Sequence, residues 1–429
     1  MHVETSPERL AFPGLRDDND TLGQCMRCGF CTIHCPTFVL LRDERDGPRG
    51  RVRFAMQILN EDRAATPEAI HHLDRCLSCL ACTSACPFGV DHSHLWDQAR
   101  AKIEETGARP ASHRLWRRML AYVFTSPHIF RYALKAAPAG RVFRPLLPKR
   151  LARMVDSAPA NTQVANPVQG TKSFAAQGER RMRVALLAGC VQQVLGSEID
   201  AATVRILTRH GCEVVVPSGS GCCGAVHLHL GLPNDARNLA RQNIAAWESM
   251  IDTGLDAVVV NASGCGSSVK DYGVLLEDDP AWADRARRMA SLTRDITEVL
   301  SEFQFDYVQD VAGTSVALHL PCSLQHGQGI AKTPRRLLEE AGFSVREASE
   351  SHLCCGAAGT YNLLQPDISD SLGKRKAELL NETKADVIAT GNMGCLLHIA
   401  RFSRQPIVHT VELLDWATGG RRPARLARG

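Results

Sequence analysis

The cysteines near the N-terminus have the spacing of metal ligands. The pattern Cys-x-x-Cys-x-x-Cys-x-x-x-Cys-Pro occurs twice, first from Cys25 to Pro36 and again from Cys76 to Pro87. Two-residue gaps let one tight loop place three thiolates around a cubane cluster, whereas the wider third gap and the proline direct the fourth cysteine to the other cluster. Zinc sites use paired Cys-x-x-Cys turns without this third cysteine. The spacing therefore predicts two [4Fe-4S] clusters, one held by Cys25, Cys28, Cys31 and Cys86, and the other by Cys76, Cys79, Cys82 and Cys35.

Helices are expected to position these two loops. Apolar residues fall on one face of residues 49–60, and Thr66 followed by Pro67 is typical of a helix start for residues 67–75. We therefore expect a helical domain over residues 1–105, in which helix-flanking loops hold both clusters.

The C-terminal half contains an internal repeat. The run from Arg183 to Cys190 is echoed from Ser315 to Cys322, the Cys-Cys-Gly at 222–224 is echoed at 354–356, and the run ending at Cys265 is echoed by one ending at Cys395. The offsets are 132, 132 and 130 positions, so the three landmarks keep one register. We therefore expect two copies of one domain, over residues 183–311 and 312–420, followed by a basic tail at 421–429.

Each copy has the pattern of an α/β domain. Short apolar runs at 184–187, 257–260, 316–320 and 387–389 are typical of buried parallel strands, and amphipathic helices are predicted at 200–210 and 334–341. The fold class is therefore predicted to be α+β and multidomain, with a helical two-cluster ferredoxin domain followed by two repeated α/β domains.

Four cysteines in each copy form a second group of candidate ligands. Several of them follow a strand directly, at the carboxyl edge where open α/β sheets place their sites. Four thiolates can hold zinc or an iron–sulfur cluster, or can act as a dithiol redox site, and the alternative is buried thiols at a domain boundary. Because adjacent cysteines occur in both copies, a metal or redox role is predicted. The two sets are Cys190, Cys222, Cys223 and Cys265, and Cys322, Cys354, Cys355 and Cys395.

Two residues near these sets are assigned separately. Cys212 belongs to neither set and is predicted to be a core residue. His398 follows Cys395 by three positions, where Ser268 follows Cys265. It is either a further ligand or a structural histidine.

Residues 106–182 are expected to connect the two halves. From Thr106 to Val155 there are eleven Lys and Arg residues and no Asp or Glu, so the formal charge of +4 depends on this segment. Basic amphipathic helices with interleaved aromatic residues suit an anionic membrane surface, and the alternative is a connector that packs on the other domains. No nucleic-acid partner is predicted, although nucleic acid attracts the same charge. Residues 156–180 are expected to be a flexible linker.

The cysteine usage favours a reducing compartment. No signal peptide and no uninterrupted apolar stretch of about 18 residues is visible. The thiols are therefore expected to lie in the cytoplasm, free to bind metal, with peripheral contact at the inner face of the cell membrane.

No organic cofactor site is predicted. Gly219-Ser-Gly-Cys-Cys-Gly224 matches the dinucleotide fingerprint as a bare pattern, but the second copy lacks the first two glycines and no acidic residue follows at the required distance. A chain with two clusters and no flavin or nicotinamide site passes single electrons and cannot take a hydride. We therefore expect it to connect a flavin-bearing partner to an electron acceptor.

Taken together, the motifs resemble those of the iron–sulfur subunits of bacterial glycolate oxidase. The resemblance rests on the double cluster motif, on Asp46-Gly-Pro-Arg-Gly-Arg51, on His72-Leu-Asp-Arg-Cys-Leu and on the paired CCG domains, and it covers nearly the whole chain. It implies a complex with FAD-binding subunits that oxidise glycolate to glyoxylate, with electrons delivered to a quinone-type acceptor.

Related subunits share parts of this pattern. Lactate-utilisation, anaerobic glycerol-3-phosphate dehydrogenase and heterodisulfide reductase subunits also carry paired CCG domains. Heterodisulfide reductases end each cysteine set with Cys-x-x-Cys, whereas this chain has Ser268 and His398 at those places. This departure favours electron transfer over catalytic disulfide reduction. About eight irons per chain are expected if only the two cubane clusters load.

Overall fold

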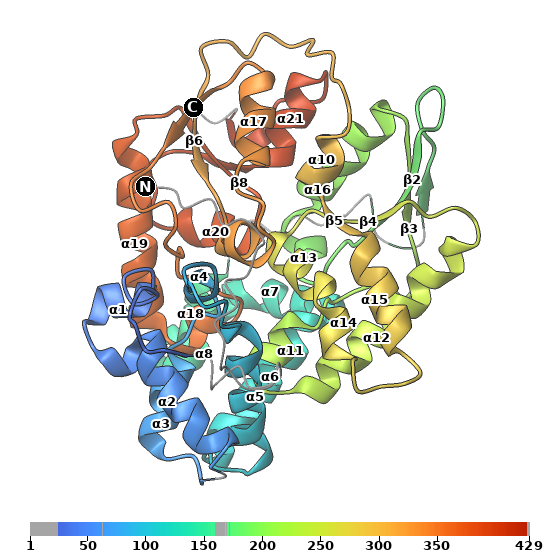
Figure 1. Ribbon diagram of the computed structural model, residues 1–429. Helices are drawn as coiled ribbons and strands as arrows, with labels where there is room; N and C mark the ends of the chain where they lie inside the picture. The colour runs from blue at the N-terminus through green and yellow to red at the C-terminus, as the bar shows by residue number, and fades with distance from the viewer. Residues whose placement is uncertain (1–24, 62, 159–167, 169, 171, 427–429) are drawn as a thin grey trace.

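The computed structural model describes residues 25–61, 63–158, 168, 170 and 172–426. The N-terminal part is helical, and the C-terminal part contains two sheets with helices around them (Figure 1). This arrangement confirms the predicted α+β class. The expected basic tail and the expected flexible linker each lie partly outside the described residues.

The helical N-terminal part is built from short helices around the two cysteine loops. The predicted helices at 49–60 and 67–75 are confirmed within a residue at each end, and the Thr66 hydroxyl accepts a hydrogen bond from the Ala69 N–H at 3.1 Å. A core that includes Val52, Leu73 and Trp96 joins three of these helices. The elements are α1 (Pro36–Leu41), η1 (Glu44–Asp46), α2 (Pro48–Leu59), α3 (Pro67–Asp74), α4 (Ala81–Ser84) and α5 (His92–Glu105).

A buried carboxylate ties these helices together. Asp46 is fully buried, and its carboxylate lies 2.9 Å from Nδ1 of His72 and 2.7 Å from a guanidinium nitrogen of Arg75. The Arg51 guanidinium lies 3.8 Å away and donates to the carbonyl oxygen of His72. Buried charges are stable only when they are paired and hydrogen-bonded in this way. The run from Asp46 to Arg51 therefore fixes how the two cysteine loops face each other.

The connector is helical and packs on the C-terminal half. Phe130 and Leu134 pack with Val194, and Arg153 pairs with Asp370 at 2.7 Å. Although the segment itself has no acidic residue from Thr106 to Val155, some of its basic charges pair with other parts of the chain. Arg117 is buried and pairs with Asp74, and Arg109 pairs with Asp74 and Glu104. The helices are α6 (Ala111–Thr125), α7 (Pro127–Val142), η2 (Arg144–Leu146) and α8 (Lys149–Ser157).

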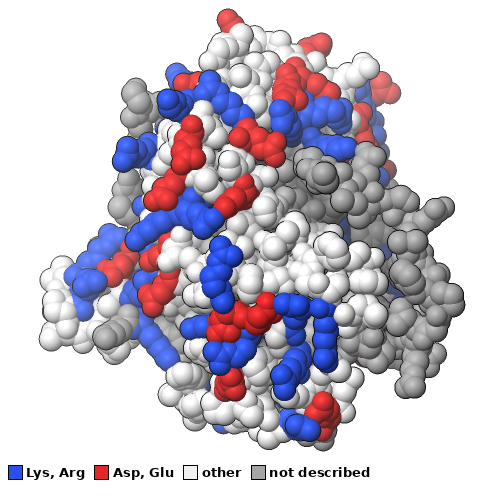
Figure 2. Space-filling model, turned by 60° about the vertical axis from the view of Figure 1, so that its left-hand side comes forward, with Lys and Arg blue, Asp and Glu red and all other residues white. Residues whose placement is uncertain are grey.

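The outer face of the connector nevertheless exposes large apolar side chains. Leu115, Tyr122, Tyr132 and Leu146 are all more than 60% exposed. Arg118 and Lys135 are exposed on the same helices, one turn from Tyr122 and Tyr132 respectively. By contrast, acidic and basic side chains are interleaved on the face shown in Figure 2. None of the described helices is long and apolar enough to cross a membrane.

The first sheet has the strand order β1-β3-β2-β4-β5. Its strands pair in parallel, except that β1 runs antiparallel to β3. Residues 172–174 were expected in the linker, but they form this edge strand because they pair with residues 214–216. The strands are β1 (Lys172–Phe174), β2 (Met182–Leu186), β3 (Cys212–Val216), β4 (Ala257–Val260) and β5 (Thr293–Asp295). The helices are α9 (Gln192–Leu195), α10 (Ser197–Arg209), α11 (Ala225–His229), α12 (Pro233–Ile251), α13 (Ser263–Lys270), α14 (Tyr272–Leu275), α15 (Ala283–Leu292) and α16 (Ile296–Leu300).

The second sheet repeats this order as β7-β6-β8-β9, with every pair parallel. The equivalent strand orders confirm the internal repeat and its predicted parallel strands. The strands are β6 (Ser315–His319), β7 (Ser344–Glu347), β8 (Val387–Thr390) and β9 (Ile407–His409). The remaining elements are η3 (Ser323–Gly327), α17 (Thr333–Glu340), α18 (Tyr361–Leu364), α19 (Pro366–Glu382), α20 (Met393–Ile399), α21 (Thr410–Ala417) and η4 (Ala424–Leu426).

The carboxyl ends of the two sheets meet near the helical domain. The hydroxyls of Ser263 in α13 and Ser323 in η3 lie 2.8 Å apart, and Asn392 donates to Ser263 at 3.1 Å. Ser84 of α4 lies 2.7 Å from Nδ1 of His326, so the second cysteine loop reaches the same region. The helical domain therefore sits against the edge where each repeat places its cysteines.

Candidate metal centres

The first cavity is lined by the four cysteines predicted for one cluster. Cys25, Cys28, Cys31 and Cys86 surround it, together with Arg49 and His92. Cys28 is exposed whereas Cys31 is buried. Burial and the neighbouring thiols Cys86 and Cys25 raise the pKa of Cys31 to about 12. The cavity thus has one side open to solvent.

The second cavity contains the other predicted set and is more enclosed. Cys35, Cys76, Cys79 and Cys82 line it, and all except Cys76 are buried. Burial raises the pKa of Cys79, with a further contribution from the charge of Cys322 in the second repeat. Leu77, Cys79 and Ala81 pack against Cys354 and Tyr361. The second repeat therefore closes this cavity.

The backbone of each loop explains how three cysteines fit around one centre. Arg27 and Gly29 have φ of +53° and +90°, and Ser78 and Leu80, the matching residues of the second loop, have φ of +50° and +62°. Left-handed backbone at these places turns the chain twice within one motif. Three of these residues are not glycine, so a positive φ strains their backbone. Such strain persists only where the surrounding structure determines the backbone conformation.

The donor sets fit cubane clusters. Each cavity offers four sulfurs, and crowded buried thiols resist ionisation unless a cationic centre compensates their charge. No three of these eight sulfurs, all in described residues, lie within 4.8 Å of one another, so neither set is as compact as the ligands of a single tetrahedral ion. Each predicted set of four cysteines therefore lines one cavity, and their role as cluster ligands stays a prediction.

Arg51 is a functional candidate that the sequence did not single out as a site residue. It is only 2% exposed, and its guanidinium lies 3.7 Å from the Cys35 sulfur and donates to the Thr37 hydroxyl at 3.0 Å. A buried cation beside a cluster ligand changes how readily the centre accepts an electron. The only signal in the sequence was its place in the Asp46–Arg51 run.

The cysteines of the first repeat come together in chain order. Cys222 contacts Cys190 and Cys223, and Cys223 contacts Cys265. Hydrogen bonds from Cys222 and Cys265 lower the pKa of Cys223. Cys212 is fully buried in the core, as predicted, and burial raises its pKa to about 12.

The second repeat has the same order of contacts. The sulfurs of Cys322 and Cys354 lie 3.7 Å apart, and Cys355 contacts Cys354 and Cys395. Gly356 has φ of +91°, and a Cβ atom there would come within 2.6 Å of the Ser369 carbonyl oxygen. The third residue of Cys-Cys-Gly is therefore required by both its backbone conformation and its close packing.

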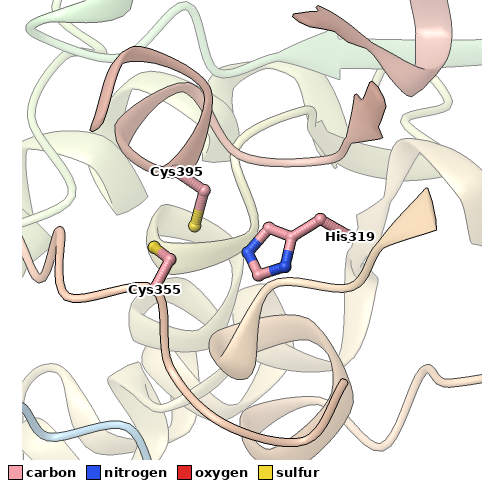
Figure 3. A group of neighbouring side chains, drawn as sticks. All are labelled: His319, Cys355 and Cys395. Atoms are coloured by element: carbon pink, nitrogen blue, oxygen red, sulfur yellow. The ribbon is translucent and has the colours of Figure 1, made fainter. Parts of the chain in front are cut away.

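The two histidines of this region differ in their surroundings. His398 lies with Nε2 3.0 Å from the carbonyl oxygen of Ser369, which is a structural contact. His319 ends strand β6 and forms a close group with Cys355 and Cys395 (Figure 3). Burial, with the nearby Lys376 charge, lowers the pKa of His319 to about 3, so its imidazole is neutral at pH 7. Sequence reasoning missed His319, although the repeat aligns it with Leu187.

Comparison with known families agrees with this architecture. Residues 21–90 match the 4Fe-4S dicluster domain, and residues 184–270 and 316–400 both match the cysteine-rich domain, CCG. The protein is therefore an iron–sulfur protein with two [4Fe-4S] clusters and two CCG repeats.

Similar individual proteins show to which family of iron–sulfur proteins the chain belongs. The chain is 38% identical over 417 residues to the glycolate oxidase iron–sulfur subunit of Escherichia coli (strain K12), covering 97% of this chain and 99% of the relative. It is 31% identical to a probable glycolate oxidase iron–sulfur subunit of Bacillus subtilis (strain 168), covering 90% of this chain and 89% of the relative. Lactate utilization protein A of the same B. subtilis strain is 32% identical but covers only 54% of this chain, with 99% of the relative aligned. The chain belongs to the family of glycolate oxidase iron–sulfur subunits.

A solved structure shares the fold. A hypothetical protein from Helicobacter pylori aligns with a TM-score of 0.53 and 9% identity, over 88% of this chain and 68% of that chain. At this identity the match concerns the fold alone.

Proposed function

We propose that this chain is the electron-transfer subunit of a glycolate-oxidising complex. FAD-binding partner subunits oxidise glycolate to glyoxylate, and the electrons leave through this chain to a quinone-type acceptor. The observation that carries the proposal is the pair of adjoining four-cysteine cavities, one open at Cys28 and the other closed by the second repeat. The near full-length similarity to glycolate oxidase iron–sulfur subunits supports the choice of substrate.

When bound, a [4Fe-4S] cluster takes up and releases one electron at a time. The residues of this chain hold the two clusters side by side and control their exposure. Met26 lines the open cavity, and Met26, Phe30 and Ile33 of the same cysteine loop are 59–67% exposed; such exposed apolar side chains suit a protein partner. The first cavity is therefore the proposed point of contact with the flavin subunits.

The connector is the proposed membrane contact. Its exposed Leu115, Tyr122, Tyr132 and Leu146 lie among basic side chains, which is the composition of an interfacial amphipathic surface. Quinone is lipid-soluble, so a complex held at the membrane surface reaches its acceptor without a spanning helix.

Ligand substitution in the assembled complex tests whether this chain transfers electrons while the partner subunits oxidise glycolate. Cys28→Ser and Cys79→Ser each remove a ligand from one cavity, and Cys212→Ser is the control because Cys212 lies in the core and in neither cavity. We expect the first two variants to lose glycolate-dependent quinone reduction while glycolate still reduces the flavin. Loss of flavin reduction in an intact complex would contradict the proposal. Faster flavin reduction by lactate or glycerol 3-phosphate than by glycolate would overturn the substrate assignment.

A further inference from the structure

The second repeat contains a compact group of one histidine and two cysteines. The ligand atoms of His319, Cys355 and Cys395 all lie within 4.8 Å of one another, and all three residues are buried. They come from the end of β6, the Cys-Cys-Gly loop and the first turn of α20. Figure 3 shows the imidazole facing the two sulfurs. Three separate segments of chain therefore place nitrogen and sulfur donors around one point.

An unpaired polar atom points to a missing partner. His319 is 3% exposed, and its Nε2 has no hydrogen-bond partner in the described structure. Buried polar atoms in native proteins almost always have a partner, so each exception needs an explanation. A metal ion bonded to the imidazole and the two sulfurs supplies one.

The first repeat does not reproduce this group. Leu187 occupies the place of His319 at the end of the equivalent strand run, whereas all four cysteines are present in both copies. A second difference lies on the equivalent helices α19 and α12. Lys376 lies ten residues after the first residue of α19, and Asn243 lies ten residues after the first residue of α12. Lys376 is 3% exposed, and the charges of Cys354 and Cys355 act on it. Lys376 donates to the carbonyl oxygen of Glu350 at 2.6 Å, whereas Asn243 of the first repeat donates to the carbonyl oxygen of Cys222 at 2.9 Å.

The spacing of the donors distinguishes a single ion from a cluster. In a tetrahedral zinc site with Zn–S of about 2.3 Å and Zn–N of about 2.0 Å, neighbouring donors lie about 3.5–3.8 Å apart. Donors within 4.8 Å need only a small closing movement to reach that geometry. The eight cysteines of the helical domain form no group this compact among the described residues.

We propose that His319, Cys355 and Cys395 bind one zinc ion, in the second repeat and not in the first. The two thiols release their protons when they bind the ion, and the neutral imidazole binds through a nitrogen lone pair. Cys354, which contacts both Cys355 and Cys322, lies next to the group and is the candidate for a fourth ligand, as a third thiolate. Zinc has no redox chemistry, so the ion joins β6, the Cys-Cys-Gly loop and α20 and takes no electron.

Metal analysis of the full chain, purified without oxygen, tests the assignment. We expect one zinc and about eight irons per chain in the unsubstituted protein. His319→Leu, which copies the first repeat, should lose the zinc and keep the irons. Cys223→Ser, at the position equivalent to Cys355, is the matched control and should keep both metals.

X-ray absorption at the zinc edge adds a measurement that needs no variant. The expected first shell contains nitrogen at about 2.0 Å together with sulfur at about 2.3 Å. A shell of oxygen and nitrogen only would overturn the proposal. So would a loss of about four irons from His319→Leu, which indicates a cluster, or an equal zinc loss from Cys223→Ser. The iron count of the unsubstituted protein bears on the proposed electron-transfer function, whereas the zinc count and the effect of His319→Leu bear on this inference alone.

Discussion

Replacing Arg51 by glutamine should make the reduction potential of the cluster in the second cavity more negative. The guanidinium lies 3.7 Å from the Cys35 sulfur, and a cluster held by Cys35 would carry the added electron on its iron and sulfur atoms. For charge centres roughly 7 Å apart at an effective dielectric constant of about 20, the interaction is roughly 2 kcal/mol. For a one-electron couple this corresponds to a shift of roughly 100 mV.

Two further variants separate charge from geometry. Arg51→Lys keeps the positive charge but loses part of the hydrogen bonding to Thr37 and His72, so its potential should stay near that of the unsubstituted protein. Arg53→Gln removes an exposed charge from the same helix, where water and salt screen it, and should have little effect.

A redox titration followed by electron paramagnetic resonance measures both clusters in one sample. Only one of the two potentials should move in Arg51→Gln. Equal shifts in the Gln and Lys variants would refute the reasoning, because hydrogen bonding and not charge would then control the potential. A shift below roughly 20 mV, well under the electrostatic value, would also refute it.

Three other expectations follow from buried and exposed charges. Changing Arg118 and Lys135 together to Gln should weaken binding to anionic vesicles by about 2 kcal/mol, roughly 30-fold at low salt. Changing the exposed Arg288 and Lys374 to Gln is the control and should leave vesicle binding unchanged. Equal binding by both variants in a sedimentation assay would exclude the connector as the contact. Asp74→Asn should lower the free energy of unfolding by about 3–5 kcal/mol in urea titrations, because Arg109 and Arg117 lose a buried partner, whereas the exposed Asp156→Asn should cost less than about 1 kcal/mol. Burial lowers the pKa of His409 from 6.5 to about 4, so the folded state favours neutral imidazole, and about 3 kcal/mol of stability present above pH 6.5 is lost as the pH falls to about 4. His409→Asn should show a smaller loss over that range, and an unchanged pH dependence would contradict the assignment.

The cysteine sets were predictable because cluster ligands obey local rules. Two-residue gaps and a Cys-Pro ending determine which sulfurs share a centre, and the structure places each predicted set of four around one cavity. The repeat and its parallel strands were equally accessible, because three landmarks keep one register. The ligand roles of individual cysteines remain predictions.

Other features depended on distant parts of the chain. The burial of Arg117 follows from Asp74, which lies on a helix of another domain, and β1 forms only because β3 offers it an edge. The amino-acid composition of a segment does not show that Asp74 pairs with Arg117 or that β3 pairs with β1. His319 could have been noticed, because an ionisable residue replaces Leu187 at a buried position of the repeat. A residue that differs between two otherwise equivalent repeats can indicate a site, and the spacing of cysteines alone does not reveal it.

The closure of the second cavity by the second repeat has a consequence for assembly. Cys35, Cys79 and Cys82 are buried, and Cys79 packs against residues that lie more than 270 positions later in the chain. With the second repeat docked, only Cys76 of the four cysteines of this cavity stays partly exposed, whereas the first cavity stays accessible at Cys28. We therefore expect iron–sulfur insertion at the second cavity to precede docking of the C-terminal half. The same packing limits the access of oxygen and chelators, so we expect damage and repair in the mature protein mainly at the first cavity.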